Sequence, residues 1–475
     1  MDEIKLSDDV IEQIKDFDRY RLTEEQESLI DKLITDKKLK NHYKKYGLCR
    51  ICKSSLYYCQ SCNSSYFKQN FKNWTSGNHN VDEFIQKAQL NAKNAIQILE
   101  WIEYDKFEDV EYLAKGGFGT VFKAVWKDGP WETSYSYQVK RKGETKVALK
   151  CSHNLQSITT EFLKEVESNI LACKFSSGHI VRYFGITKDP KTNNFIMVME
   201  LKNGSLRQHL NNDFISLNWY QKLMILLGIA YGLNDIHNKG LIHNDFHCGN
   251  ILSNFDRCAF ITDLGLCQPA DVKSSQYSNK KICGVLPYVA PEVLRGKKYT
   301  QASDIYGFGI IIYEICTGLP PYHDIAHDEF LAIKICNGLR PKSNYKIPQL
   351  IFNIINQCWD ADPLKRPKAD ELRNLFARLW SYCDKSDSLI SEQAKEANKI
   401  NKKSSSKVQL PLSSTGALQY MTHPQAVYTS RILDFKNLPE PKNADNNDDL
   451  LEMEYSDSLR VDFTKYDINS KDESN

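Results

Sequence analysis

Hydrophobic and polar positions divide the chain into four parts, and the first, residues 1–47, is charged and helix-forming. Within it, Thr23-Glu24-Glu25-Gln26 has the capping-box pattern that starts a helix. Apolar residues follow at helical spacing, namely Leu29, Ile30, Leu33 and Ile34. The pattern predicts an amphipathic helix whose stripe is a packing face.

The other three parts differ in how their apolar residues are spaced. Residues 48–108 begin with cysteines, continue through aromatic positions and end in a predicted helix over Asp82–Ile102. Residues 109–380 alternate between strand and helix patterns with short breaks, as a folded domain does. Residues 381–475 turn to Ser, Lys, Asn and Asp, which predicts a largely disordered tail in which only Tyr428–Leu433 could dock.

Composition favours a soluble protein of the cell interior. Charged residues make up 26% of the 475 and hydrophobic residues 41%, with a net charge of +2 that gives no reason to expect a nucleic acid partner. No secretory signal follows Met1, and no run reaches the ~18 apolar residues of a membrane helix. The longest apolar run, Leu223–Leu233, contains two glycines and predicts a buried core helix. We expect a cytoplasmic location, with the nucleus left open, and no membrane partner.

Four of the 14 cysteines form two Cys-x-x-Cys pairs, Cys49 with Cys52 and Cys59 with Cys62, separated by six residues. Four thiolates at this spacing can hold one tetrahedral Zn²⁺, so the sequence predicts a zinc knuckle. Reduced structural cysteines are the alternative, whereas a redox pair lacks its usual strand–helix context. A structural or protein-docking zinc makes this segment a candidate site for a regulatory protein. The other ten cysteines are scattered as core residues of a reducing compartment.

A glycine-rich turn at 114–121 joins two strand patterns, and glycines allow backbone N–H groups to approach a phosphate. Val147-Ala148-Leu149-Lys150 follows as a buried strand that ends in a lysine. Glu165 then lies in an amphipathic helix pattern. Each of these features alone also fits an ordinary solvated charge or turn.

The stronger signal is the segment 243–252 together with Asp263, which flank a strand–turn–strand pattern. Asn250 and Asp263 offer the hard oxygen atoms that Mg²⁺ prefers. Asp245 is then left to accept a proton from a substrate hydroxyl.

In this order, the motifs resemble the signature set of the protein kinases. Ala290-Pro291-Glu292, the helix that opens at Asp304, and Arg366, which in that family pairs with the Ala-Pro-Glu glutamate, extend the resemblance over Tyr112–Trp380. It implies an α+β, two-lobed fold: a small antiparallel-sheet N-lobe with one helix and a mostly helical C-lobe. We expect this domain at 109–380, preceded by a small helical and zinc-knuckle segment and followed by the disordered tail.

The resemblance assigns roles by position. Asp245, Lys150, Glu165, Asn250 and Asp263 are the expected catalytic residues, with Asn250 and Asp263 on Mg²⁺ and Lys150 held by Glu165. ATP is expected to contact a longer set of residues: Ala114, Lys115, Gly116, Gly117, Phe118, Gly119, Val121, Ala148, Lys150, Met199, Glu200 and Leu201.

Several positions depart from the family pattern. Ala114 replaces the first loop glycine, Leu264 replaces the phenylalanine of Asp-Phe-Gly, and Asn244 replaces the arginine beside the catalytic aspartate. His247 and Val285 match neither the serine/threonine nor the tyrosine pattern. The chain is most similar to the tyrosine-kinase-like group, and in detail it resembles kinase families expanded in mycorrhizal fungi.

These patterns predict an ATP-dependent protein kinase of intracellular signalling. It transfers the γ-phosphoryl group of Mg-ATP to Ser or Thr of protein substrates, with Tyr left open. The alternative is a scaffold that keeps the fold and binds ATP with little catalysis. Because all five expected catalytic residues are present, we favour the enzyme.

Overall fold

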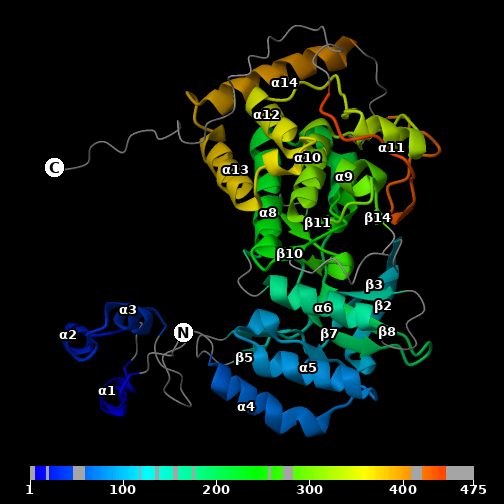
Figure 1. Ribbon diagram of the computed structural model, residues 1–475. Helices are drawn as coiled ribbons and strands as arrows, with labels where there is room; N and C mark the ends of the chain where they lie inside the picture. The colour runs from blue at the N-terminus through cyan, green and yellow to red at the C-terminus, as the bar shows by residue number, and fades with distance from the viewer. Residues whose placement is uncertain are drawn as a thin grey trace, which may run out of the picture.

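The computed structural model describes residues 6–17, 21–46, 59–116, 119–133, 139–152, 159–173, 177–254, 258–270, 282–407 and 420–444. A sheet-based N-lobe and a helical C-lobe lie one above the other (Figure 1). This confirms the predicted α+β, two-lobed architecture.

Three helices form a unit at the amino-terminal end, α1 (Asp8–Ile14), α2 (Glu24–Leu33) and α3 (Lys37–Tyr46). The predicted capping box is present, because the Thr23 side chain accepts from the Gln26 backbone and the Gln26 side chain bonds back to the Thr23 backbone. Ile30 and Ile34 of the predicted stripe are buried in a core that these helices share.

A six-stranded sheet forms the N-lobe, in the order β1-β7-β8-β6-β3-β2. Its strands are β1 (Glu100–Trp101), β2 (Phe107–Gly116), β3 (Gly119–Trp126), β6 (Thr145–Ser152), β7 (Tyr183–Lys188) and β8 (Phe195–Glu200). All neighbours pair antiparallel except β1 with β7. Strands β4 (Trp131–Thr133) and β5 (Val139–Arg141) pair antiparallel as a separate two-stranded sheet. The helix α6 (Thr160–Ala172) packs against the six-stranded sheet.

The segment before β2 is part of this lobe. Helices α4 (Gln60–Asn70) and α5 (His79–Asn91) precede β1, and Val81 and Ile85 of α5 share a core with Phe162 and Val166 of α6. The predicted boundary between residues 108 and 109 therefore does not separate two packed units.

The helix predicted over Asp82–Ile102 is wrong in its second half. The helix α5 ends at Asn91, and the chain then enters a short turn before β1. The Asn94 side chain caps that turn by accepting from the backbone N–H of Gln97. Leu99 is fully buried in the N-lobe core directly before β1, so its apolar side chain packs next to a strand rather than on a helix.

The C-lobe is built around two nearly wholly buried helices, α8 (Trp219–His237) and α10 (Gln301–Thr317). The predicted core helix over Leu223–Leu233 is confirmed within α8. The remaining helices are α7 (Leu206–Asp213), α9 (Pro291–Leu294), α11 (Glu329–Cys336), α12 (Gln349–Cys358) and α13 (Ala369–Cys383). Short strands complete the lobe: β9 (Gly204–Ser205), β10 (Leu241–Ile242), β11 (Ile251–Ser253), β12 (Ala259–Ile261), β13 (Gln268–Pro269) and β14 (Ile282–Gly284).

Two parts of the tail are ordered, contrary to the prediction of a largely disordered segment. Helix α14 (Leu389–Lys407) buries Ile390, Ala394 and Ala397 against the C-lobe. Residues 420–444 cross the same lobe in extended form and include β15 (Arg431–Leu433), coloured orange-red in Figure 1. Docking of the predicted segment Tyr428–Leu433 is confirmed. Within the described ranges, no helix combines the length and apolar character needed to cross a membrane.

Candidate active site

Three charged residues meet where the N-lobe sheet faces the C-lobe. The Lys150 Nζ atom, on β6, lies 2.7 Å from Glu165 Oε1 on α6 and 3.0 Å from Asp263 Oδ1. The hydroxyl of Tyr183 donates to the same Glu165 oxygen at 2.8 Å, which fixes the carboxylate. Gly265 allows this approach, because a Cβ atom there would lie 2.8 Å from Glu165 Oε2. The structure thus joins residues 113 positions apart in sequence.

The ion pairs set the charge state of this cluster. Burial alone would lower the pKa of Lys150, but the carboxylates of Asp263 and Glu165 outweigh burial and raise that pKa above its ordinary value. Burial opposes the charged form of Asp263 as well, yet the Lys150 ammonium group lowers the pKa of that carboxyl. All of this favours a lysine that stays protonated at neutral pH.

The glycine-rich turn closes the hairpin of β2 and β3. Gly116 pairs with Gly119, Lys115 with Thr120 and Ala114 with Val121. The predicted contacts Gly117 and Phe118 lie outside the described residues. Val121 also pairs with Lys150 on the neighbouring strand, so the turn lies one strand away from the lysine.

Apolar side chains from both lobes gather beside the lysine. Ala148 and Met199 are buried members of one cluster, and Val121 and Leu201 pack against it from the edge. Leu252 of β11 packs against the same cluster from the C-lobe. Sequence reasoning missed Leu252, although its position two residues after Asn250 could have indicated it. The predicted contact Glu200 pairs with Lys202, with 2.7 Å between Oε1 and Nζ.

Asp245 stands in a buried loop before β11, and its Oδ1 atom is buried with no hydrogen-bond partner in the described structure. Asn250 Nδ2 donates to the Asp245 backbone carbonyl at 3.0 Å and to Asp245 Oδ2 at 3.2 Å. His247 Nε2 lies 3.5 Å from the same Oδ2. One carboxylate oxygen is therefore held by neighbours, and the other has no partner among the described residues.

Asp304, at the start of α10, holds the backbone of the loop that carries Asp245. Its carboxylate accepts from the backbone N–H groups of His243 at 2.8 Å and Asn244 at 3.1 Å. His237 Nε2 lies 2.9 Å from the same side chain. The sequence marked Asp304 as a helix start but gave it no role in the site. Only the fold places it under a loop 60 residues earlier.

Asn244 stands where the family has an arginine, and its side chain hydrogen bonds to the segment that follows Asp263. It has a left-handed backbone, with φ of 68°, which asparagine tolerates better than most residues. Its Nδ2 atom donates to the Leu266 carbonyl, and its Oδ1 atom accepts from Gln268 Nε2 at 3.4 Å. These bonds tie the Asp245 loop to the segment after Asp263 without a phosphate.

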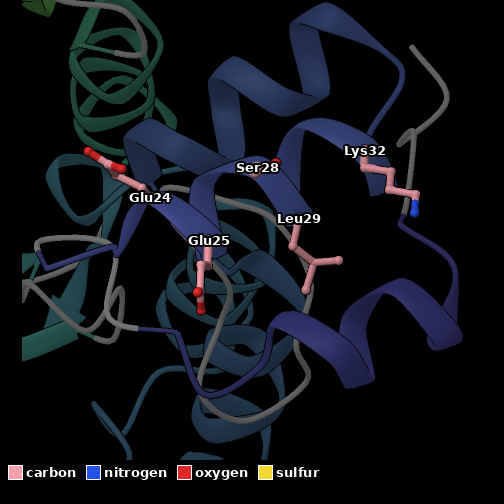
Figure 2. A pocket seen from close by; sticks show the side chains of 5 residues that line it. All are labelled: Glu24, Glu25, Ser28, Leu29 and Lys32. Atoms are coloured by element: carbon pink, nitrogen blue, oxygen red, sulfur yellow. The ribbon is translucent and has the colours of Figure 1, made fainter.

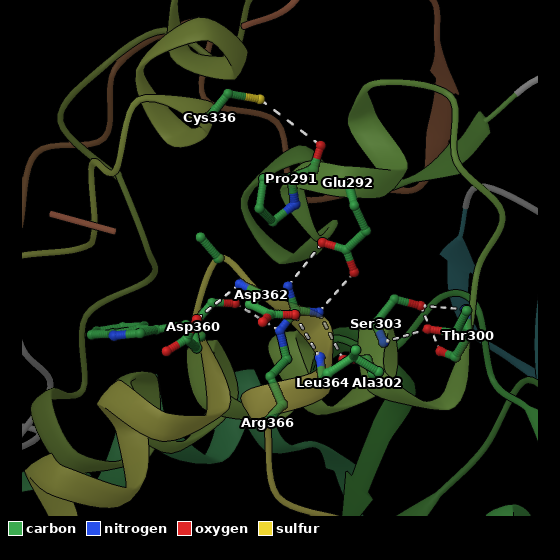
Figure 3. Close-up of polar contacts among 12 residues, drawn as sticks. Pro291, Glu292, Thr300, Ala302, Ser303, Cys336, Asp360, Asp362, Leu364 and Arg366 are labelled. Carbon is green, nitrogen blue, oxygen red and sulfur yellow. Dashed lines mark hydrogen bonds and ion pairs between the residues drawn. The ribbon is translucent and has the colours of Figure 1, made fainter. Parts of the chain in front are cut away.

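Arg366 and Glu292 form the predicted pair, shown in Figure 3. The two arginine Nη atoms bond the two carboxylate oxygens at 2.7 and 2.8 Å. Arg366 also donates to the backbone carbonyls of Asp360 at 2.8 Å and Ala302 at 2.9 Å. The pair holds the segment at Pro291 against α10.

Only two of the four predicted zinc ligands lie within the described residues. Cys49 and Cys52 lie outside the described residues. Cys59 is buried just before α4 and Cys62 is on that helix. Among the residues that the structure describes, no three His, Cys, Asp or Glu side chains gather as metal ligands. The zinc knuckle stays a prediction.

Two surface hollows lie away from these residues. One is lined by Glu24, Glu25, Ser28, Leu29 and Lys32, all on α2 (Figure 2). The other lies on the N-lobe surface around Thr75–Gly77 and Trp101. Neither is lined by Lys150, Glu165 or Asp263.

Comparisons with known proteins agree on the central domain. The sequence model described as protein tyrosine and serine/threonine kinase matches residues 107–376. The probable serine/threonine-protein kinase roco5 of Dictyostelium discoideum is 32% identical over 285 residues, covering 56% of this chain and 9% of that protein. The tyrosine-protein kinase SPK-1 of Girardia tigrina is 28% identical over 275 residues, covering 56% of this chain and 52% of the relative.

A third relative carries an additional domain in its name. This probable LIM domain-containing serine/threonine-protein kinase of Dictyostelium discoideum is 25% identical over 324 residues, or 64% of this chain and 46% of the relative. The chain thus spans about half or less of the length of these three relatives. Since the family match covers more than half of the chain, the chain belongs to the protein tyrosine and serine/threonine kinase family.

Proposed function

We propose that the chain is an active protein kinase that transfers the γ-phosphoryl group of ATP to a protein hydroxyl. The observation that carries this proposal is the ion-pair cluster in which Lys150 contacts Glu165 and Asp263 at once. A buried lysine held between two carboxylates is positioned rather than solvated. Such positioning is the main contribution that a protein makes to phosphoryl transfer.

The nucleotide has matching groups on each side. The apolar cluster with Ala148 and Met199 of the N-lobe and Leu252 of the C-lobe supplies apolar side chains for contact with an adenine ring. Lys150 would carry the positive charge for the α- and β-phosphates, and the backbone at Gly116 and Gly119, where β2 and β3 pair, would cover those phosphates.

The donor set also fits a magnesium ion. Asn250 and Asp263 would hold the ion, because amide and carboxylate oxygens are the hard ligands that Mg²⁺ prefers, and the hydrogen bonds of these side chains described above use Asn250 Nδ2 and Asp263 Oδ1. When bound, the ion neutralises charge on the phosphate oxygens.

Asp245 is the proton acceptor in this mechanism. The acceptor hydroxyl hydrogen bonds to Asp245 Oδ1, the oxygen that has no partner in the described structure. The hydroxyl oxygen forms a bond to the γ-phosphorus, the bond from that phosphorus to the bridging oxygen breaks, and ADP leaves with the electron pair. The proton passes to Asp245.

Serine and threonine are the acceptors that we propose, on the strength of the tyrosine-kinase-like resemblance and of the serine/threonine kinases among the relatives. A place inside the cell suits the buried thiols of Cys248, Cys316 and Cys358, which sit in the core as cysteines do in reducing compartments. A regulatory protein at the amino-terminal segment remains a prediction.

Turnover of Mg-ATP on a basic protein acceptor tests the proposal. Lys150→Met and Asp263→Asn should each lower the rate by on the order of 10²–10³ or more, because each removes charge stabilisation of the transferring phosphate. Lys146→Met is the matched control, since Lys146 lies exposed on the same strand. It should leave the rate unchanged. A wild-type chain without turnover would instead favour the scaffold, and folded variants with wild-type rates would remove the site assignment.

A further inference from the structure

The segment 420–444 (the strap) runs across the C-lobe beside α11 and β14 (Figure 1). Backbone bonds hold it at several points along its length. The His423 N–H donates to the His323 carbonyl at 2.8 Å, the His327 N–H donates to the Gln425 carbonyl at 3.0 Å, and the Lys442 N–H donates to the Cys336 carbonyl at 2.8 Å. The strap is thus bound over most of its length.

In its middle, the strap forms a β-ladder with the segment that follows the Asp263 motif. Strand β15 pairs antiparallel with β14, with Arg431 opposite Gly284, Ile432 opposite Cys283 and Leu433 opposite Ile282. Leu433 is 3% exposed and belongs to the C-lobe core, whereas Ile432 is 59% exposed. The two neighbours therefore point to opposite faces, and only one contributes burial.

The ladder ends directly beside the proposed proton acceptor. A Cβ atom built on Gly284 would lie 3.7 Å from Asp245 Oδ1. A substrate hydroxyl must come within about 3 Å of that oxygen to give up its proton. Since a serine or threonine hydroxyl is only two bonds from its own Cα atom, the main chain of an acceptor must pass close to Gly284. The strap already pairs with that glycine, because Arg431 is its partner in the β14–β15 ladder.

Before β15, the side chain of Tyr428 attaches the strap to the C-lobe. Arg207 of α7 pairs with Glu314 at 3.0 Å, and its guanidinium carbon lies 4.3 Å from the centre of the Tyr428 ring. The Tyr428 hydroxyl donates to the Pro321 carbonyl at 2.9 Å. The strap thus rests on a buried cation, which attracts the ring face.

The far end of the strap is held by Arg295, which follows α9. Its Nη1 and Nη2 atoms bond the two Glu440 carboxylate oxygens at 2.6 and 2.5 Å, and its Nε atom donates to the Leu438 carbonyl at 3.1 Å. Leu438 is buried beside this clamp. The Glu440 side chain itself is 74% exposed, so the clamp can be changed without opening the core.

We propose that the strap is an intramolecular competitor of the protein substrate, because its β15 already pairs along one edge of β14, the strand that ends beside Asp245. An extended peptide that adds to an open strand edge is a common mode of recognition. The inference rests on the proposed kinase function. Its partner is defined chemically: an acceptor polypeptide in extended form, which gains access to β14 when the strap leaves.

The full-length chain and four variants test this. In Leu433→Asp, loss of the buried leucine should release the strap and lower the KM for a basic protein acceptor by roughly tenfold or more. Ile432→Asp, at the exposed neighbour, is the matched control and should leave that KM unchanged. Glu440→Arg should lower it about fivefold, and the charge-swapped Arg295→Glu/Glu440→Arg should restore it. The KM for ATP should stay constant throughout.

A binding measurement separates this inference from the proposed function. A fluorescent peptide of residues 420–440 should bind folded Leu433→Asp and not the wild-type chain, whether or not either chain turns over ATP. If Leu433→Asp does not fold, Glu440→Arg carries the comparison. Equal acceptor KM in all chains, with no difference in peptide binding, overturns the inference. So does stoichiometric phosphate on Thr429 or Ser430, because the strap is then an acceptor and not a competitor.

Discussion

Replacing Arg366 by methionine tests how much the buried ion pair with Glu292 contributes to the stability of the C-lobe. The arginine side chain is fully buried and makes charge-assisted bonds to both oxygens of Glu292, as well as bonds to two backbone carbonyls (Figure 3). Methionine fills much of the same volume but leaves the Glu292 carboxylate buried without a counter-charge. Removing one partner of a buried pair typically costs about 3–5 kcal/mol.

That cost can be measured as a shift in melting temperature. Each kcal/mol lowers the melting temperature of a domain this large by about 2–4 °C, so Arg366→Met should melt roughly 6–20 °C below the wild-type chain. Thermal unfolding followed by circular dichroism is the assay. Arg378→Met, at an exposed position on α13, the helix that follows Arg366, is the control and should melt with the wild-type chain.

A second variant distinguishes the lost pair from lost packing. In Arg366→Met/Glu292→Met no uncompensated charge stays buried, so the double variant should be less destabilised than the sum of the two single variants. If Arg366→Met melts within about 2 °C of wild type, or if the two single losses simply add, the carboxylate is not the source of the cost and this reasoning is wrong.

Three further predictions concern groups outside this pair. Burial lowers the pKa of Lys222 to about 8, so the unfolded chain holds the extra proton and the folding stability of wild type should rise from about pH 8 to 10.5. Urea unfolding of Lys222→Met should lack this rise. Freshly reduced protein should carry about one zinc ion per chain, which elemental analysis should find lost in Cys59→Ser. Because Asn244 tethers its loop without a phosphate, replacing the four hydroxyl residues within 274–278 should change basal activity less than about tenfold.

The site could be proposed from sequence because its chemistry sits in short local motifs. Each motif carries its own residue types at fixed offsets, so Asp245 and Asn250 are recognisable before any fold is known. Their partners were harder to foresee. Leu252 could have been indicated by its position two residues after Asn250, but Asp304 belongs to the site through contacts that depend on how α10 packs, and no local pattern reports such contacts.

The end of the predicted helix at Ile102 failed for a related physical reason. Apolar residues near Leu99 fit a helical stripe as well as a buried strand when they are considered alone. Strand β1 is only two residues long, and its pairing partner β7 lies more than 80 residues later. A strand of that length is stabilised almost wholly by the sheet that it joins, so its own sequence carries little sign of it.

Composition misjudged the tail because it reports whether a segment can build its own core, and not whether it can dock on an existing one. The strap contributes only two deeply buried leucines, Leu433 and Leu438. At about 1.5–3 kcal/mol each, they supply roughly 3–6 kcal/mol before the entropy of ordering is subtracted. That lies at the lower end of the about 5–15 kcal/mol that holds a whole domain together, even before the entropy cost. The strap can therefore leave β14 while the lobe stays folded, which is the property that a reversible competitor at the substrate edge requires.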